Sequence, residues 1–160
     1  MEIESLAAAL EREHREIDEG IDAFVAGSPS DESGRQRLRQ AISALRRHIY
    51  LEEEFLFPPL REAGLIAPIF VMLREHGQMW NTLDALEGEL ETGTPAVVAR
   101  LCRQLMVQLQ HHNPKEERVL YPQADHVLSA PASAELREFI DHGELPAGWV
   151  CAKAEARAER

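Results

Sequence analysis

The segment HIYLEEEFLFPPL (His48–Leu60) places a histidine and, four residues later, a glutamate in a stretch that is otherwise rich in large apolar residues. The same arrangement returns 64 residues later in HHNPKEERVLYP (His111–Pro122). The aligned pairs are His48 with His112, Glu52 with Glu116, Glu53 with Glu117, Leu56 with Leu120, Phe57 with Tyr121 and Pro58 with Pro122. Residues four apart share one face of a helix. The sequence therefore places one polar pair twice on a face that we expect to be buried.

A second motif repeats in step with the first. The tripeptide Arg-Glu-His ends at His14 and again at His76. His14 precedes His48 by 34 residues, and His76 precedes His112 by 36. The repeating unit is therefore a helical hairpin with a lone histidine on its first helix and a histidine–glutamate pair on its second. Two such hairpins related by an approximate twofold axis would bring all six side chains to one level.

Apolar residues follow the helical period in four long segments, which are Leu6–Val25, Leu38–Leu56, Ile69–Leu90 and Val98–Leu120. No segment shows the sustained alternation of apolar and polar residues that is typical of strands. We predict an all-α fold, an antiparallel up-down-up-down four-helix bundle with a short C-terminal helix and tail. Residues 1–128 would form the bundle. Residues 129–160 would form a helix over about Ala132–His142 and a polar end that frays.

Turn-forming residues separate the four segments. They lie at Gly27–Gly34, at Pro58 and Pro59 followed by Gly64 and Pro68, at Thr92–Pro95 and at Pro122. Pro114 lies within the fourth helix, between His112 and Glu116, where it removes a backbone hydrogen bond and predicts a kink.

Composition excludes several classes of function. The chain has 160 residues and a formal net charge of −11, which argues against nucleic acid and anionic membrane surfaces as partners. No apolar run approaches the ~20 residues that cross a bilayer, and the N-terminus lacks the pattern of a signal peptide. We expect a cytoplasmic location. Cys102 and Cys151 match no metal or redox spacing, and we interpret them as ordinary thiols.

Six polar residues occupy positions where the helical pattern calls for an apolar side chain. They are His14, His48, Glu52, His76, His112 and Glu116. An unpaired carboxylate in a core is strongly penalised, and two at the same depth repel each other. Bound cations between them remove both penalties, so we predict that these six residues are metal ligands. The alternative interpretations are a hydrogen-bonded polar layer without metal, and two separate mononuclear sites such as His14, His48 and Glu52.

The mixture of imidazole and carboxylate ligands favours iron, with manganese and zinc as alternatives. Two octahedral ions need about twelve coordination positions. Four histidines, two bridging glutamates and a bridging oxide or hydroxide fill about ten, which leaves about one open position per ion for a small molecule. Ferritin-like proteins place glutamate before histidine and use lone glutamates, so the reversed order here indicates a different design.

The motifs EREH, HIYLEEEFLFP, REHGQMW and HHNPKEERVLYP, in this order over residues 6–128, resemble the hemerythrin-like family of HHE cation-binding domains. The resemblance implies a left-handed four-helix bundle with a non-haem diiron centre and chemistry with O2, NO or peroxide, or iron sensing and iron–sulfur repair. Oxygen-carrying members have a second histidine one turn from the third-helix ligand, where this chain has Met72 and Trp80. The chain therefore resembles the four-histidine branch, which shifts the expectation away from reversible oxygen transport.

Three functions are compatible with this pattern. The first is a binding or sensing protein whose diiron centre responds to O2, NO or peroxide. The second is a diiron enzyme or repair factor that activates peroxide or oxygen, or donates iron to damaged clusters. The third is a helical interaction module that the metal merely stabilises.

Several neighbouring residues have ordinary interpretations. We expect Glu53 and Glu117 to be solvated surface charges, with a role as hydrogen-bond acceptors for ligand histidines as the alternative. His111, His126 and His142 should be exposed, and Met72 and Trp80 should pack in the core. Tyr50 and Tyr121 could donate a hydrogen bond to a bound ligand, although nothing in the sequence selects either one.

Overall fold

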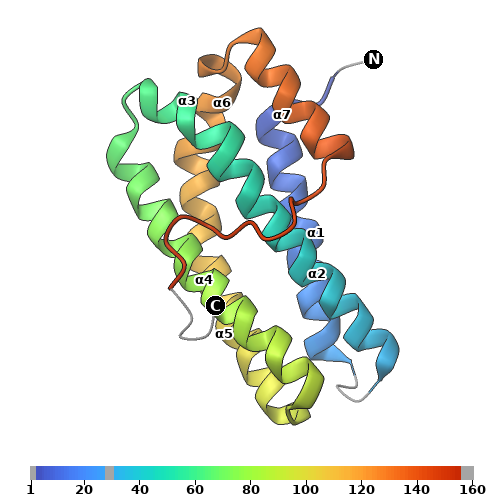
Figure 1. Cartoon of the computed structure of the whole chain (residues 1–160). Coiled ribbons are helices and arrows are strands. Elements are labelled where there is room, and N and C mark those ends of the chain that lie inside the picture. The colour runs from blue at the N-terminus through green and yellow to red at the C-terminus, as the bar shows by residue number, and fades with distance from the viewer. Residues whose placement is uncertain (1–2, 28–30, 156–160) are drawn as a thin grey trace.

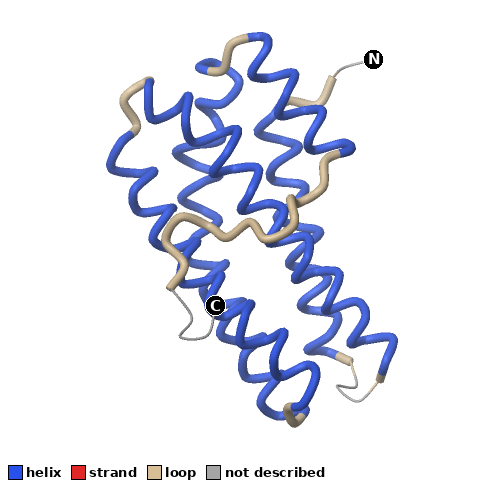
Figure 2. The backbone as a smooth tube through the Cα atoms, viewed as in Figure 1, coloured by secondary structure: helices blue, strands red, loops and turns tan. Residues whose placement is uncertain are grey.

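The computed structural model describes residues 3–27 and 31–155, and within these residues it consists of helices and loops without a strand (Figure 2). The helices are α1 (Leu6–Ala26), α2 (Glu32–Leu51), η1 (Glu52–Leu56), α3 (Phe57–Glu62), α4 (Ile66–Thr92), α5 (Pro95–Lys115), η2 (Glu116–Leu120), α6 (Tyr121–Val127) and α7 (Ala130–His142). They form four long helical legs, which are α1, α2 with η1 and α3, α4, and α5 with η2 and α6. These legs run alternately up and down (Figure 1). The predicted all-α bundle is confirmed.

The order of the legs in space follows the two sequence hairpins. The first hairpin packs α1 against α2, and the second packs α4 against α5. Contacts of α1 with α5 and of α2 with α4 close the square. The two hairpins therefore face each other across one interior, as the internal repeat predicts.

The second and fourth legs each contain one turn of π-helix at the same point of the repeat. In η1 the amide of Phe57 donates to the carbonyl of Glu52, and in η2 the amide of Tyr121 donates to that of Glu116. Pro58 and Pro59 follow the first π turn and Pro122 follows the second, in each case in the first turn of the next α-helix. A proline is tolerated there because that position needs no amide donor.

The expected break at Pro58, Pro59, Gly64 and Pro68 is present, but the prolines Pro58, Pro59 and Pro122 do not themselves end their helices. Pro58 and Pro122 lie inside legs that continue to Glu62 and Val127. The second leg ends just before Gly64, whose φ of 106° favours glycine. Pro114 likewise lies inside α5, and the irregularity that we expected at this proline appears downstream as η2.

The core is divided into two apolar clusters. One fills the end of the bundle near the α1–α2 and α4–α5 turns and includes Ile17, Ile49, Met79 and Leu109. The other fills the opposite end and includes Leu10, Leu56, Met72 and Leu120. Buried polar residues occupy the level between them. The apolar clusters thus isolate one polar layer at mid-height of the bundle.

The chain after the bundle packs on it closely. Helix α7 begins at Ala130, two residues before the expected start. Residues 144–155, which we name the C-terminal strap, then run across the second leg to α4 (Figure 1). Cys151 is buried in the core, and the amide of Glu155 donates to Asn81 Oδ1 at 3.2 Å. The expectation of a frayed end is therefore wrong up to residue 155.

Parts of two predicted segments lie outside the described residues. They are residues 28–30 of the turn at Gly27–Gly34 and residues 156–160 of the tail. The division of the chain at residue 128 stays a prediction. Within the described part of the chain, no helix is long and apolar enough to span a bilayer.

Candidate metal centre

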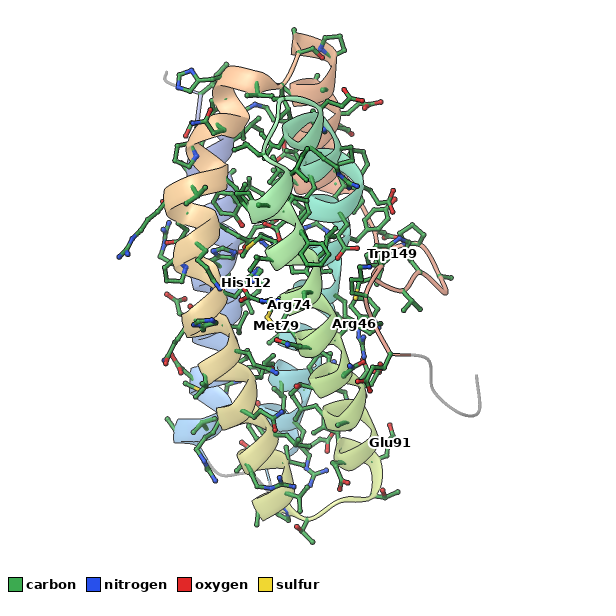
Figure 3. All side chains as sticks on the ribbon, turned by 90° about the vertical axis from the view of Figure 1, so that its left-hand side faces the viewer. Arg46, Arg74, Met79, Glu91, His112 and Trp149 are labelled. Atoms are coloured by element: carbon green, nitrogen blue, oxygen red, sulfur yellow. The ribbon has the colours of Figure 1, made fainter. Side chains whose placement is uncertain are left out.

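The structure brings the six predicted ligands together in the polar layer, and all six are buried. One comes from α1, one from α4, and the two histidine–glutamate pairs come from the junctions of α2 with η1 and of α5 with η2. Figure 3 shows His112 inside the bundle at this level, with Met79 below it. Their role as metal ligands stays a prediction, but the convergence on which it depends is present.

The six side chains form two overlapping groups that share both glutamates. Each group has one donor atom per residue, and these atoms lie within 4.8 Å of one another. The first group is His14, His48, Glu52 and Glu116, and the second is Glu52, His76, His112 and Glu116. Because Glu52 and Glu116 belong to both groups, their two oxygens can serve two cations. The two groups therefore form one continuous cluster rather than two separate sets of residues.

The Nε2 atoms of the histidines point toward the shared carboxylates. His76 Nε2 lies 3.1 Å from Glu52 Oε1 and 3.6 Å from Glu116 Oε2. His14 Nε2 and His112 Nε2 each lie 3.1 Å from Glu116 Oε1. His48 Nε2 lies 3.4 Å from Glu52 Oε2. A cation can lie between these nitrogen and oxygen atoms, because a bond from a metal to either atom is shorter than their separation. For zinc such bonds are about 2.0–2.2 Å long.

A second carboxylate contacts the Nδ1 atom of each of the four histidines in the layer. The Nδ1 contacts are His14 with Glu117 at 2.7 Å, and His48 with Glu13, His76 with Glu53 and His112 with Glu75 at 2.8 Å each. An ionised carboxylate only accepts hydrogen bonds, so each Nδ1 carries the proton. Nε2 is then the ring atom that faces the centre, and it would bind a cation once it has lost its proton, as is typical of metal-bound histidines.

The interpretation of Glu53 and Glu117 as surface charges is therefore wrong. The Glu53 side chain is 5% exposed and that of Glu117 is 35% exposed, and both contact predicted ligand histidines on other helices. The paired glutamates themselves open a π turn, which differs from the regular helix assumed for the prediction. The less favoured alternative, an acceptor for a ligand histidine, describes their contacts.

Sequence analysis missed Glu13 and Glu75 altogether. Each directly precedes a ligand histidine, yet it contacts a histidine on the next helix rather than its own neighbour. The signal was present in the repeated Arg-Glu-His motif, in which the glutamate is as regular as the histidine. The partner could not be deduced because it depends on the rotation of one helix against another.

Basic side chains stand behind two of these glutamates. Arg47 Nη1 lies 3.1 Å from Glu13 Oε2, and Lys115 pairs with Glu75. Arg47 also donates to the carbonyls of Ile140 and Gly143, both at 2.8 Å, and thereby ties the end of α7 to the site. Both basic groups lie outside the layer of ligands, so they neutralise the outer carboxylates and leave the inner ones for a cation.

Charge coupling within the layer shifts the pKa values of several of its residues in the metal-free protein. Burial lowers the pKa of His48, but the carboxylates of Glu52 and Glu13 outweigh it and raise this pKa to about 10. Burial and Glu116 raise the pKa of Glu52, yet His48 and His76 bring it below its usual value. The metal-free layer therefore contains imidazolium–carboxylate pairs, and a cation would replace the protons on Nε2.

Tyr121 also reaches the centre, which sequence analysis could not decide. Its hydroxyl donates to Glu52 Oε2 at 2.6 Å and lies 2.8 Å from His14 Nε2 and 3.0 Å from His48 Nε2. The π turn makes this possible, because Tyr121 follows Glu116 by five residues and still contacts it at 3.3 Å. Tyr50 instead packs against Phe139 and Trp149.

The remaining expectations for single residues hold. His111 is 75% exposed, and His126 and His142 are exposed as well. Met72 is buried in the apolar cluster above the layer, and Trp80 packs edge-on against Trp149. Both cysteines are free thiols in the core.

The donor set fits a bound cation. Four buried atoms of the second group make no hydrogen bond within the described part of the chain, namely Glu52 Oε1, His76 Nε2, His112 Nε2 and Glu116 Oε2. Buried polar atoms without partners are costly and rare, and an ion is one explanation for a set that converges. Nitrogen and oxygen donors without thiolates suit iron, manganese or zinc.

A family model described as the Hemerythrin HHE cation binding domain matches residues 5–124. This match covers every residue of the candidate site. In the same comparisons, no curated protein and no solved structure matches the chain.

Proposed function

Starting from the fact that the chain belongs to the hemerythrin HHE cation-binding domain family, we propose that it holds two non-haem iron ions and responds to a small ligand. The ligand class is O2, NO or peroxide, and the response is a sensing or redox function in iron or oxidative stress. Membership of the family and the buried histidine–glutamate groups support binding of a metal, with iron favoured.

The observation that supports this proposal most strongly is the convergence of four imidazole Nε2 atoms on two shared carboxylates. Each imidazole is oriented from behind by its own glutamate. Such outer carboxylates fix the tautomer and raise the basicity of a metal-bound histidine. Four of the converging atoms make no hydrogen bond within the described residues, and a cation placed between them would satisfy all four.

The ligand count favours reaction with a small molecule over a closed structural site. An iron pair binds small oxygen- and nitrogen-containing molecules at open positions and changes its oxidation state. One turn on either side of His76, helix α4 presents the buried side chains of Met72 and Trp80 rather than a further ligand. The apolar clusters above and below exclude water from the layer, which strengthens the interaction of the carboxylates with cations.

The C-terminal strap supports a sensing role over simple binding. Glu53 holds His76 with Oε2 and accepts a hydrogen bond from the amide of Ala152 with Oε1 at 2.9 Å. One carboxylate therefore connects a proposed ligand to an exposed segment. A change in the position of His76 on ligand binding would be transmitted to the strap through this contact.

The proposal is tested with iron-loaded protein that has been reduced anaerobically. Addition of NO or O2 should change the optical spectrum, and Glu52→Ala, which removes a shared carboxylate, should abolish the change. A spectrum that does not respond to either gas contradicts the proposal. Sustained turnover of peroxide with an electron donor, lost in Glu52→Ala, would instead favour the diiron enzyme.

A further inference from the structure

The two halves of the proposed centre differ, although the internal repeat would make them alike. We name His14 and His48 with the shared carboxylates the tyrosine half, because the Tyr121 hydroxyl lies among its donor atoms. That oxygen is 2.6–3.3 Å from one donor atom of each of the four residues. A hydroxyl therefore occupies the space between the donors, where a cation would bind.

The other half contains His76 and His112 with the same carboxylates, and we name it the phenylalanine half. Phe57 stands where the repeat places Tyr121, and its ring stacks on His76 with centroids 5.5 Å apart and an angle of 18°. Phenylalanine has no hydroxyl to offer. Every residue of this half keeps one buried donor atom without a hydrogen bond within the described residues.

We propose that the two cation positions are inequivalent and fill in order, and this inference rests on the proposed metal-binding function. The first divalent cation binds in the phenylalanine half, where four donor atoms make no hydrogen bond and contact only other members of the layer, so that no further group has to be displaced. The second binds more weakly in the tyrosine half, because it must displace the Tyr121 hydroxyl from its contacts with these four residues. A single hydroxyl thus turns a repeated site into an asymmetric one.

Repulsion between two cations would also separate two affinities, even in a symmetric site. The location of the first cation and the effect of removing the hydroxyl distinguish the two causes. Repulsion alone would leave the first cation distributed over both halves. It would also be unaffected by the loss of a neutral hydroxyl.

The first experiment locates the tight position by titrating Co²⁺ anaerobically into metal-free protein in a calorimeter. His76→Ala should lose the tight phase, whereas the matched His14→Ala should keep it and lose the weak phase. The inference is overturned if His14→Ala loses the tight phase or if both variants behave alike. NMR of the wild type with half an equivalent of Co²⁺ answers the same question without a variant that could misfold. The Nδ1 protons of His76 and His112 should show the large contact shifts of directly bound imidazoles, and those of His14 and His48 only the smaller shifts that act through space.

The second experiment removes the hydroxyl with Tyr121→Phe. The affinity for the second Co²⁺ should rise at least about tenfold, which corresponds to ~1.4 kcal/mol, while the first stays within about threefold. Tyr50→Phe is the control, because Tyr50 packs among aromatic rings away from the ligands. An unchanged second affinity in folded Tyr121→Phe overturns the inference. Folded wild type that binds no Co²⁺ or iron would defeat the proposed function itself, whereas two equal affinities would defeat the inference alone.

Discussion

At the scale of single residues, the carboxylates behind the histidines decide how firmly the site is held. Glu117 is the simplest of them, since its contact with His14 Nδ1 at 2.7 Å is its one ion pair among the described residues. Replacing this carboxylate by an amide removes the charge that orients His14 and raises its basicity.

We expect Glu117→Gln to weaken metal binding about 10- to 100-fold, the usual effect of losing such a partner. The measurement is a competition titration against a chelator of known affinity. The exposed Glu62 provides the control, because Glu62→Gln removes the same charge away from the layer. Equal affinities of wild type and Glu117→Gln would show that the outer carboxylate does not support a ligand.

The coupled pKa values predict opposite effects of pH on the metal-free and metal-loaded protein. Neighbouring carboxylates outweigh burial and raise the pKa of His48 to about 10, and those of His76 and His112 rise as well. The stabilisation that these protonated histidines give to the folded protein is complete below the usual histidine pKa of 6.5. It is lost as pH rises through the raised pKa values. The ionised carboxylates of Glu52 and Glu116, whose pKa values are lowered, stabilise the folded protein above the usual glutamate pKa of 4.5. This stabilisation is lost as the carboxylates become protonated in acid.

Unfolding by urea should therefore show that the metal-free protein is most stable between about pH 4.5 and pH 6.5 and weakens toward pH 10. Metal affinity should instead increase over the same alkaline range, because a cation replaces the protons on Nε2. Calorimetry in buffers of different ionisation enthalpy should report protons released on binding. Metal affinity that is independent of pH would contradict ligation by these imidazoles.

At the scale of the elements, helix α4 carries two glycines with different surroundings. A Cβ on Gly77 would lie 2.3 Å from the backbone oxygen of Lys153, so the C-terminal strap passes directly over this glycine. A Cβ on Gly88 would meet nothing within 4 Å. The close approach of the strap, rather than a special backbone angle, requires glycine at position 77.

Gly88→Ala should raise the free energy of unfolding by about 0.5–1 kcal/mol through helix propensity. Gly77→Ala should displace the strap, move Trp149 away from Trp80, shift tryptophan emission to the red and speed tryptic cleavage at Lys153. Fluorescence and limited proteolysis of the two variants side by side check this. A strap that stays protected in Gly77→Ala would mean that it does not lie against α4.

The helices could be predicted from the apolar period, but the π turns could not. A proline is compatible both with the end of a helix and with its first turn, so Pro58 and Pro122 did not distinguish a break from a continuation. The six inner residues were evident because polar residues in an apolar stripe are exceptional. Glu13 and Glu53 were not, because a glutamate beside a ligand is ordinary until the neighbouring helix is in place.

At the scale of the whole molecule, two apolar clusters enclose one polar layer built from two similar hairpins. The clusters and the ion pairs of the metal-free layer should keep the fold without metal. The metal should then add stability by binding the folded state. With free metal at 1,000 times the dissociation constant, this contribution is about 4 kcal/mol per ion.

Urea unfolding of metal-free and metal-loaded protein should therefore give two cooperative transitions at clearly different midpoints. Complete unfolding on chelation would instead favour the interaction module that the metal merely stabilises. Coincident midpoints would indicate that the folded layer does not bind the metal.

The most direct test of the diiron account is the iron content of wild-type protein, reconstituted with ferrous iron, oxidised and desalted, together with its optical spectrum. The account predicts two irons per chain with absorption of an oxo-bridged pair, and loss of both features in Glu52→Ala and Glu116→Ala. A folded wild-type protein that retains less than one iron per chain, or the same iron content in all three proteins, would contradict it.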